Sequence, residues 1–245
     1  MRRFILAVFL GSCLNCPAQS VDDIVSKAIA ARGGMEKLKS VQTQRLTGTL
    51  AIRDNPPAPF MVEMKRGGKM RQEATIQGQS DLRVTDGTTG WKVNAENGGN
   101  PQPLSPGELK NMVGGADIDG PLVDYQAKGN KIELEGKEKV DGSDAYKLKI
   151  TQKDGQVRYD YVDATSYLEV KWQGEIDGGD RKYVAESFFK DYRPVNGVMY
   201  HYRIDSDTLG TSYTQKLVFD KIEVNLPLDD ALFGKPTPNS GNSPK

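Results

Sequence analysis

The chain has 245 residues, and its 33 basic side chains balance its 33 acidic ones, so it lacks the strongly basic surface of a nucleic-acid-binding protein. Two cysteines and one histidine are too few for a disulfide framework or a structural zinc site. We therefore expect no metal and no cofactor, and a fold that is held together by its own apolar core.

The N-terminal segment has the layout of a secretory signal peptide. Two arginines precede an apolar run over residues 4–14, which is far shorter than the roughly 20 residues needed to span a bilayer. Small side chains at Cys16 and Ala18 suit a cleavage site, so we predict that residues 1–18 are removed and the mature chain is exported. The alternative is a lipoprotein signal in which Cys13 is lipidated. Both cysteines fall in this segment, so the mature chain is expected to have none.

The stretch 31–52 marks a change in the period of the apolar residues. Before it, they recur at three- and four-residue spacings, which is typical of amphipathic helices. Within it, Leu46 and Leu50 begin the alternation of a strand. We therefore predict a helix that starts at Ser20, ends near Gly33 and packs against the first strand of a large antiparallel sheet.

Alternating segments separated by turn residues fill the rest of the chain. The Asp-Gly pair at 86–87 favours a tight hairpin because both residues tolerate a positive φ. The alternation is interrupted over residues 94–130, where Ser105 suits the start of a short helix that crosses the face or mouth of the sheet. In the last strand the apolar residues change parity, which predicts a bulge near Asp220 and Lys221.

The expected architecture is mainly β. A twisted sheet of about eleven antiparallel strands tends to curl or split in two. With few helices available, we predict an unclosed half-barrel whose concave face is covered by helices, and a β-sandwich is the alternative. Residues 19–235 are assigned to this single domain, and residues 236–245, mostly Pro, Gly, Ser and Asn, to a disordered tail.

The apolar faces of these elements define a candidate binding site. Any one of the residues is suited to fill a core, but a curved sheet of this size encloses more volume than a few short helices fill. Methionines also suit a wall that repacks around a flexible chain. The candidate lining residues are Ile24, Ala28, Leu38, Leu46, Leu50, Phe60, Val62, Met64, Met70, Trp91, Leu148, Tyr159, Leu168, Trp172 and Phe189. Ile24, Ala28 and Leu38 are expected to face Leu46 and Leu50 across the concave side.

No catalytic or metal-binding motif is found. The single histidine, His201, falls by parity on the more polar face of its strand, where we expect an exposed structural residue. Residues 117–120 resemble the start of a calcium loop, but the third ligand and the distal glutamate are missing, so a capped turn is expected. The acidic pair at 229–230 predicts a short helical start. We therefore do not expect an enzyme.

Blocks of sequence spread over nearly the whole mature chain resemble the LolA-like superfamily. They are ARGGMEKL at 31–38, DGTTGW at 86–91, DATSYL at 163–168, DYRPVNGV at 191–198 and NLPLDDALF at 225–233. The resemblance implies a periplasmic protein of a bacterium with two membranes, built as an unclosed β barrel with a helical lid over an apolar cavity. It also implies that the cavity takes the acyl chains of lipoproteins. The carriers of this superfamily latch their lid with a strand arginine, whose nearest counterpart here is Arg45.

These expectations lead to two hypotheses of different classes. The first is a periplasmic binding or carrier protein that holds a lipid or lipoprotein acyl moiety in the half-barrel, with outer-membrane lipoprotein sorting as the process that the resemblance suggests. The second is a non-catalytic interaction or stress-sensing module whose sheet edge or aromatic face, with Tyr200 and Tyr202, binds another envelope protein. It requires a filled core. A hydrolase would need His201 beside a serine and a carboxylate.

Overall fold

The computed structural model describes residues 19–96, 98–178 and 181–237. Within that part of the chain, the α-helices are α1 (Val21–Ala31), α2 (Met35–Ser40) and α3 (Pro106–Gly115), and η1 (Asp230–Phe233) is a 3-10 helix. The strands are β1 (Thr43–Ile52), β2 (Ala58–Lys65), β3 (Lys69–Ile76), β4 (Gln79–Thr85), β5 (Gly90–Val93), β6 (Gln102–Pro103), β7 (Lys131–Val140), β8 (Ser143–Thr151), β9 (Val157–Asp163), β10 (Glu169–Asp177), β11 (Lys182–Val195), β12 (Val198–Thr208) and β13 (Thr214–Val224).

Two of the predicted terminal segments fall outside this description. The predicted signal peptide lies wholly in residues 1–18, and residues 238–245 make up most of the predicted tail, so both remain predictions. The boundaries of the predicted single domain remain a prediction as well. None of the helices in the described residues has the length and apolar character needed to cross a membrane.

All the strands belong to one antiparallel sheet that does not close into a barrel. The spatial order is β6-β5-β4-β3-β2-β1-β13-β12-β11-β10-β9-β8-β7, so β6 and β7 are its two edges. The predicted mainly β half-barrel is therefore confirmed. In the residues that the structure describes, the sheet has thirteen strands rather than about eleven. One of the additional strands, β6, has only two residues and lies in the Pro- and Gly-rich segment where no strand was expected.

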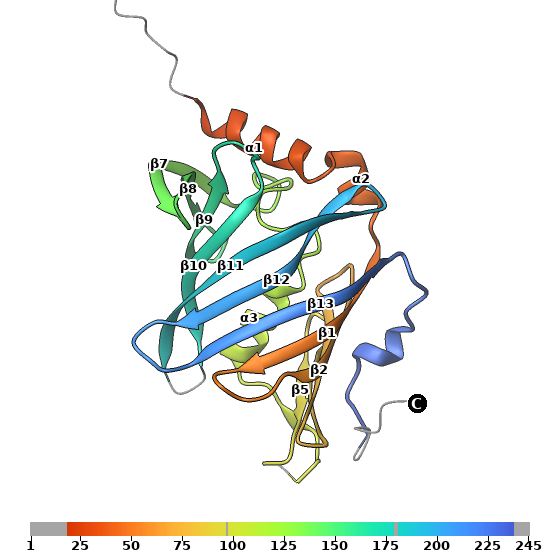
Figure 1. Ribbon diagram of the computed structural model, residues 1–245. Coiled ribbons are helices and arrows are strands. Elements are labelled where there is room, and N and C mark those ends of the chain that lie inside the picture. Colours follow the sequence, from red (N-terminus) through yellow and green to blue (C-terminus); the bar gives the residue numbers. More distant parts are fainter. Residues whose placement is uncertain (1–18, 97, 179–180, 238–245) are drawn as a thin grey trace, which may run out of the picture.

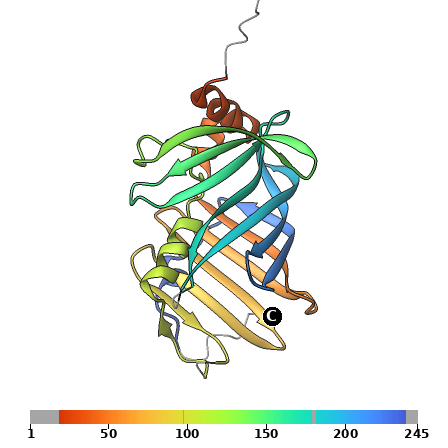
Figure 2. The ribbon, with the colours of Figure 1, turned by 90° about the vertical axis from the view of Figure 1, so that its left-hand side faces the viewer.

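The chain passes from one edge of the sheet to the other through residues 104–130, which we call the crossing segment. It contains α3, which contacts β3 and β4 on one half of the sheet and β10 on the other. Figure 2 shows α3 lying across the opening of the curved sheet, between its two halves. The predicted helix over this part of the sheet is therefore present, and Ser105 caps it by accepting a hydrogen bond from the Glu108 amide at 3.3 Å.

Helix α1 lies at one end of the half-barrel, next to β7–β10 (Figure 1). It begins where expected, because the Ser20 hydroxyl accepts from the Asp23 amide at 3.1 Å and the Asp23 carboxylate accepts from Ser20. Its C-terminal end is fixed on β12, where the Met199 amide donates to the Arg32 carbonyl at 2.9 Å. Gly33 follows with φ 123°, and a Cβ atom there would lie 2.3 Å from the Gly197 carbonyl oxygen, so only glycine fits.

The apolar face of α1 packs on different strands from those expected. Ile24 and Ala28 are buried against Leu148 and the other inward side chains of β7, β8 and β9. Leu38 of α2 does share a core cluster with Leu46 and Leu50 of β1. The prediction that all three helical residues face β1 is thus wrong for Ile24 and Ala28. The helix pair spans the end of the sheet, so each helix covers a different half of it.

The predicted bulge in the last strand is confirmed. On β1, Thr47 pairs with Lys221 and Gly48 with Phe219, so Asp220 is the extra residue. A Cβ atom at Gly48 would lie 2.0 Å from the Val218 carbonyl oxygen, which makes glycine necessary at this close approach. The bulge returns Phe219 and Leu217 to the concave face on which Ile222 also packs.

Candidate functional site

The concave face of the sheet and the crossing segment enclose a cavity of about 530 Å³, which we call the inner cavity. This volume is in the range of roughly 300–1,000 Å³ that is typical of small-molecule sites. Its apolar wall comes from β1, β2, β3 and β13. The wall consists of Leu46, Leu50, Ile52, Phe60, Val62, Met64, Met70, Ala74, Ile76, Leu217 and Phe219.

The end of the inner cavity next to the α1–α2 connection is polar. Its side chains come from the connection itself, from β1, and from β9–β12, and they are Arg32, Gln44, Arg158, Glu169, Tyr192, Tyr200 and His201. The opposite end is a rim that includes Asp81, Arg83 and the exposed Tyr213. The cavity is therefore an apolar surface between a polar end and an exposed polar rim.

An arginine and two carboxylates form a cluster at the polar end, in which Asp160 is fully buried and the other two are partly exposed. Arg158 Nε lies 2.6 Å from Asp160 Oδ1, and Arg158 Nη2 lies 3.3 Å from Glu169 Oε1. Tyr192 donates its hydroxyl to the Glu169 carbonyl at 2.7 Å. Burial raises the pKa of Glu169 to about 8, and the nearby charge of Asp160 adds to this shift. Burial therefore favours the neutral form of Glu169. Asp160, whose pKa burial also raises, is the closer partner of Arg158.

His201 lines the inner cavity instead of pointing to solvent, so the prediction of an exposed histidine is wrong. Its ring centroid lies 4.6 Å from that of Phe189 and 5.8 Å from that of Tyr192. Burial lowers the pKa of His201 to about 3, with a smaller effect from the charge of Arg32. The ring is therefore neutral. Within the described residues it has ring contacts but no hydrogen bond to a serine or a carboxylate, so the geometry provides no activated nucleophile.

Two arginines attach the crossing segment to the rest of the fold. Arg66 makes a two-pronged contact with Asp119, with both N–O distances at 2.8 Å, and also donates to the Val41 carbonyl at 2.7 Å. Arg32 donates to the Asp119 carbonyl at 2.8 Å. Burial disfavours ionisation of Asp119, but the hydrogen bonds and charge of Arg66 outweigh it and lower the Asp119 pKa. The segment that resembled a calcium loop is therefore an arginine-held turn.

Arg45 does not hold the crossing segment. Its guanidinium lies 2.6 Å from Glu63 Oε1 on the neighbouring strand β2, and the residue is absent from the wall of the inner cavity. The assignment of Arg45 as a lid latch is thus wrong. Arg66, in the turn between β2 and β3, occupies the position from which a side chain reaches both the crossing segment and the end of α2.

A second hollow, of about 590 Å³, lies outside the sheet between the helices and the crossing segment. Its lining includes Val25, Ile29, Met35, Leu122 and Tyr125. It is a groove that opens broadly to solvent, whereas the inner cavity lies between the sheet and the crossing segment. We therefore take the inner cavity as the candidate site.

Comparisons with known proteins concern the fold. No protein-family profile and no curated protein sequence matches the chain. Among solved structures, a LolA superfamily protein from Nitrosomonas europaea is 20% identical, with 89% of this chain and 99% of that chain covered and a TM-score of 0.56. The chain has the LolA-like fold. A DUF1329 family protein from Desulfovibrio piger (16% identity, 89% and 98% covered, TM-score 0.59) shares it. So does a putative outer membrane lipoprotein-sorting protein domain from Vibrio parahaemolyticus (10% identity, 86% and 94% covered, TM-score 0.56).

The LolA-like fold places about half of the predicted lining residues around the inner cavity. Those that line it are Leu46, Leu50, Phe60, Val62, Met64, Met70, Trp172 and Phe189. Whether they bind a ligand remains a prediction. Ile24 and Ala28 of α1 pack with Leu148 in a separate core cluster, and Leu38 lies in the core cluster that contains Leu46 and Leu50. Trp91 packs at the far edge against the cluster that contains Phe233 of η1.

The predicted direction of the side chains is wrong for β9. Tyr159 packs on the opposite face of the sheet, in the cluster that contains Tyr161, and the half-buried Leu168 is likewise outside the cavity wall. The inward residues are instead Arg158 and Asp160, because Arg158 pairs across the hairpin with the buried Ile150. Counting the hairpin register outward from the Asp154-Gly155 turn would have placed Arg158 opposite Ile150 and revealed this polar group.

Proposed function

We propose that this protein is a non-catalytic envelope protein that binds or carries a lipid, or the acyl part of a lipoprotein, in the inner cavity. The observation that carries the proposal is the apolar wall of that cavity, built from three neighbouring strands and β13 around about 530 Å³. A protein that needed only a stable core would fill this volume with side chains, because interiors are normally close-packed.

The wall suits a flexible hydrocarbon chain. Transfer of an acyl chain from water contributes about 0.8 kcal/mol for each buried methylene, so affinity does not depend on a specific polar contact. Two methionines, Met64 and Met70, lie in the wall, and their unbranched side chains adapt to chains of different length and shape. Trp172 and Phe189 extend the contact surface toward the polar end.

The cellular setting is also part of the proposal. The predicted signal peptide supports export to the periplasm, and the LolA-like fold is shared with a protein whose name refers to lipoprotein sorting. We therefore infer that the ligand is met between the two membranes, and that outer-membrane lipoprotein sorting is a process in which such a carrier would act.

The interaction-module alternative keeps one of its two expected surfaces, the sheet edge, and loses the other, the aromatic face. Tyr200 and Tyr202 are buried in the core, so they do not offer an exposed aromatic face to a partner protein. It also required a solid interior, whereas the inner cavity is open along the concave face. We therefore retain lipid or acyl binding as the function that the geometry supports best.

Lipid retention by the purified protein tests the proposal. The protein is isolated from the periplasm and examined by native mass spectrometry, and displacement of a fluorescent fatty acid is then titrated. Ala74→Phe adds a ring at a buried position of the cavity wall and is expected to weaken binding about tenfold or more. Val184→Phe, at an exposed position on β11, is the matched control. Absence of any bound lipid together with absence of displacement would contradict the proposal.

A further inference from the structure

The polar end of the inner cavity has an imbalance of charge. Among the described residues, Arg158 is balanced by Asp160 and Arg66 by Asp119. Asp117, which also lines the cavity, lies 2.6 Å from Lys128. Each of these charged groups therefore has a partner of opposite sign. The Glu169 carboxyl group lies 3.3 Å from Arg158, and burial raises its pKa.

Arg32 is the exception. Within the described chain its guanidinium donates to a backbone carbonyl, that of Asp119, and forms no ion pair with a carboxylate. A carbonyl oxygen satisfies one of the five N–H donors of a guanidinium and does not neutralise its charge. Arg32 thus places an unbalanced positive charge, with free donors, at the polar end of the cavity.

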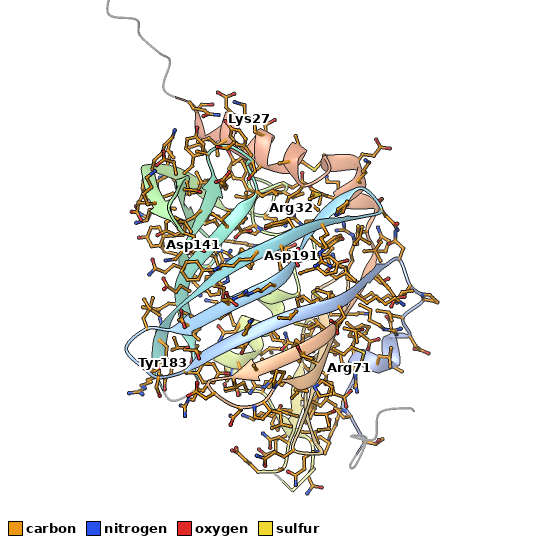
Figure 3. All side chains as sticks on the ribbon, in the orientation of Figure 1. Lys27, Arg32, Arg71, Asp141, Tyr183 and Asp191 are labelled. Atoms are coloured by element: carbon orange, nitrogen blue, oxygen red, sulfur yellow. The ribbon has the colours of Figure 1, made fainter. Side chains whose placement is uncertain are left out.

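The position of Arg32 is fixed by the fold. It is the residue that caps the C-terminal end of α1, and its carbonyl is held by the Met199 amide of β12 at 2.9 Å. A positive charge near the C-terminal end stabilises a helix, but this role does not require the Arg32 side chain to enter the cavity. Figure 3 shows the Arg32 side chain beneath the α1–α2 connection, on the side of β11 and β12. The backbone anchor therefore aims a cation at the cavity from a rigid support.

We propose that the occupant of the inner cavity is an anionic amphiphile, whose carboxylate or phosphate group pairs with Arg32 while its acyl chain lies along β1, β2 and β3. This rests on the proposed function and specifies the chemistry of the ligand. A guanidinium forms two parallel hydrogen bonds with either anion, and such charge-assisted bonds are the strong ones. Leu46 and Phe219 of the apolar wall line the same cavity as Arg32, so head and tail both have complementary surfaces.

Ligands that share one acyl chain and differ in the head group test the inference. Palmitate carries a carboxylate, 1-palmitoyl lysophosphatidate a phosphate and 1-palmitoylglycerol no charge. Each is titrated against the full-length mature protein loaded with the uncharged fluorescent probe N-phenyl-1-naphthylamine. At least one of the two anionic ligands is expected to bind about tenfold or more tightly than the neutral one, the scale of one charge-assisted hydrogen bond. The better of the two identifies the head group.

Variants assign the preference to Arg32. Arg32→Gln keeps a donor for the Asp119 carbonyl but removes the charge, so it is expected to lower the anionic preference to about threefold or less while neutral affinity is retained. Arg203→Gln, on β12 outside the cavity lining and paired with Asp205, is the matched control and should keep the preference. If Arg32→Gln does not fold, Arg32→Lys, which keeps the charge but loses the fork geometry, is used.

The outcomes separate the two proposals. Equal binding of anionic and neutral ligands by the wild-type protein overturns this inference and leaves the proposed function standing. A preference that survives in Arg32→Gln overturns the assignment to Arg32. Failure of all three ligands to displace the probe overturns the proposed function itself.

Discussion

Replacing Arg66 by methionine should free the crossing segment from the α2 end of the fold. The guanidinium holds both oxygens of Asp119 at 2.8 Å and donates to the carbonyls of Val41 and Leu38 at 2.7 and 3.0 Å. Methionine preserves the apolar length of the side chain and removes all of these bonds. Removing one partner of a buried ion pair costs about 3–5 kcal/mol. The Arg66 side chain is 31% exposed and that of Asp119 10%, so water can replace some of the lost hydrogen bonds. We therefore expect the free energy of unfolding to decrease by about 2 kcal/mol.

Urea unfolding followed by far-ultraviolet circular dichroism measures this decrease at pH 7. The effect also depends on pH. Because the Asp119 pKa is lowered in the folded protein, its ionisation stabilises the fold above the unfolded pKa of about 4, and this stability is lost as the pH falls through the lower folded value. The difference between wild type and Arg66→Met should therefore shrink in acid. Hydrogen exchange should also show faster opening of residues 116–124 in the variant.

A double-mutant cycle with Asp119→Asn isolates the pair. The two substitutions should be non-additive by about 1–2 kcal/mol, because each removes the same contact. Arg203→Met serves as the control, since its partner Asp205 is on the same strand and the Arg203 side chain is 41% exposed. An exposed pair of this kind contributes less than about 1 kcal/mol. Additive effects of the Arg66 and Asp119 substitutions would refute the reasoning.

Two further substitutions test other features. Glu169→Gln should flatten the pH dependence of the free energy of unfolding. In the wild-type protein the Glu169 pKa of about 8 lies above the unfolded value of about 4.5, so the contribution of Glu169 to stability is complete below about pH 4.5. That contribution falls by up to about 1.4 kcal/mol per pH unit as the pH rises toward 8. Urea unfolding at pH 5 and pH 9 measures this, and an equal slope in both proteins would count against a protonated Glu169. Gly48→Ala should destabilise the fold by about 1–3 kcal/mol, because the new Cβ atom would lie 2.0 Å from the Val218 carbonyl oxygen. A thermal midpoint equal to that of the wild type would show that the β1–β13 approach is looser than described.

The local features of the fold were accessible from the sequence wherever one physical rule decided them. The capping boxes at Ser20 and Ser105 locate two helix starts, and the parity change at Asp220 locates a bulge. In each case the residues that carry the pattern are neighbours in the chain. The two capping contacts are also local, whereas the bulge forms only where β13 pairs with β1.

The polar end of the inner cavity could not be predicted in the same way. Arg32 comes from the end of α1, Glu169 from β10 and His201 from β12, so the group exists only after the sheet has curved. Alternation assigned His201 to a wet face, which holds for a flat sheet with one face in solvent. In this half-barrel β12 runs past the α1–α2 connection, and the face of the strand that carries His201 lines the inner cavity.

The open edge of the sheet has a consequence for how copies of this protein meet. Strand β7 offers the free backbone groups of a ten-residue edge, which in an apolar strand would pair with the same edge of another copy. Lysine and glutamate occupy much of this strand, and the register shift between Leu134 and Gly136 interrupts it with a bulge at Glu135. Two such edges brought together would be out of step at the bulge, and many of their side chains would be charged. The charged side chains and the bulge of β7 therefore oppose the pairing of two copies of the protein through this open edge of the sheet.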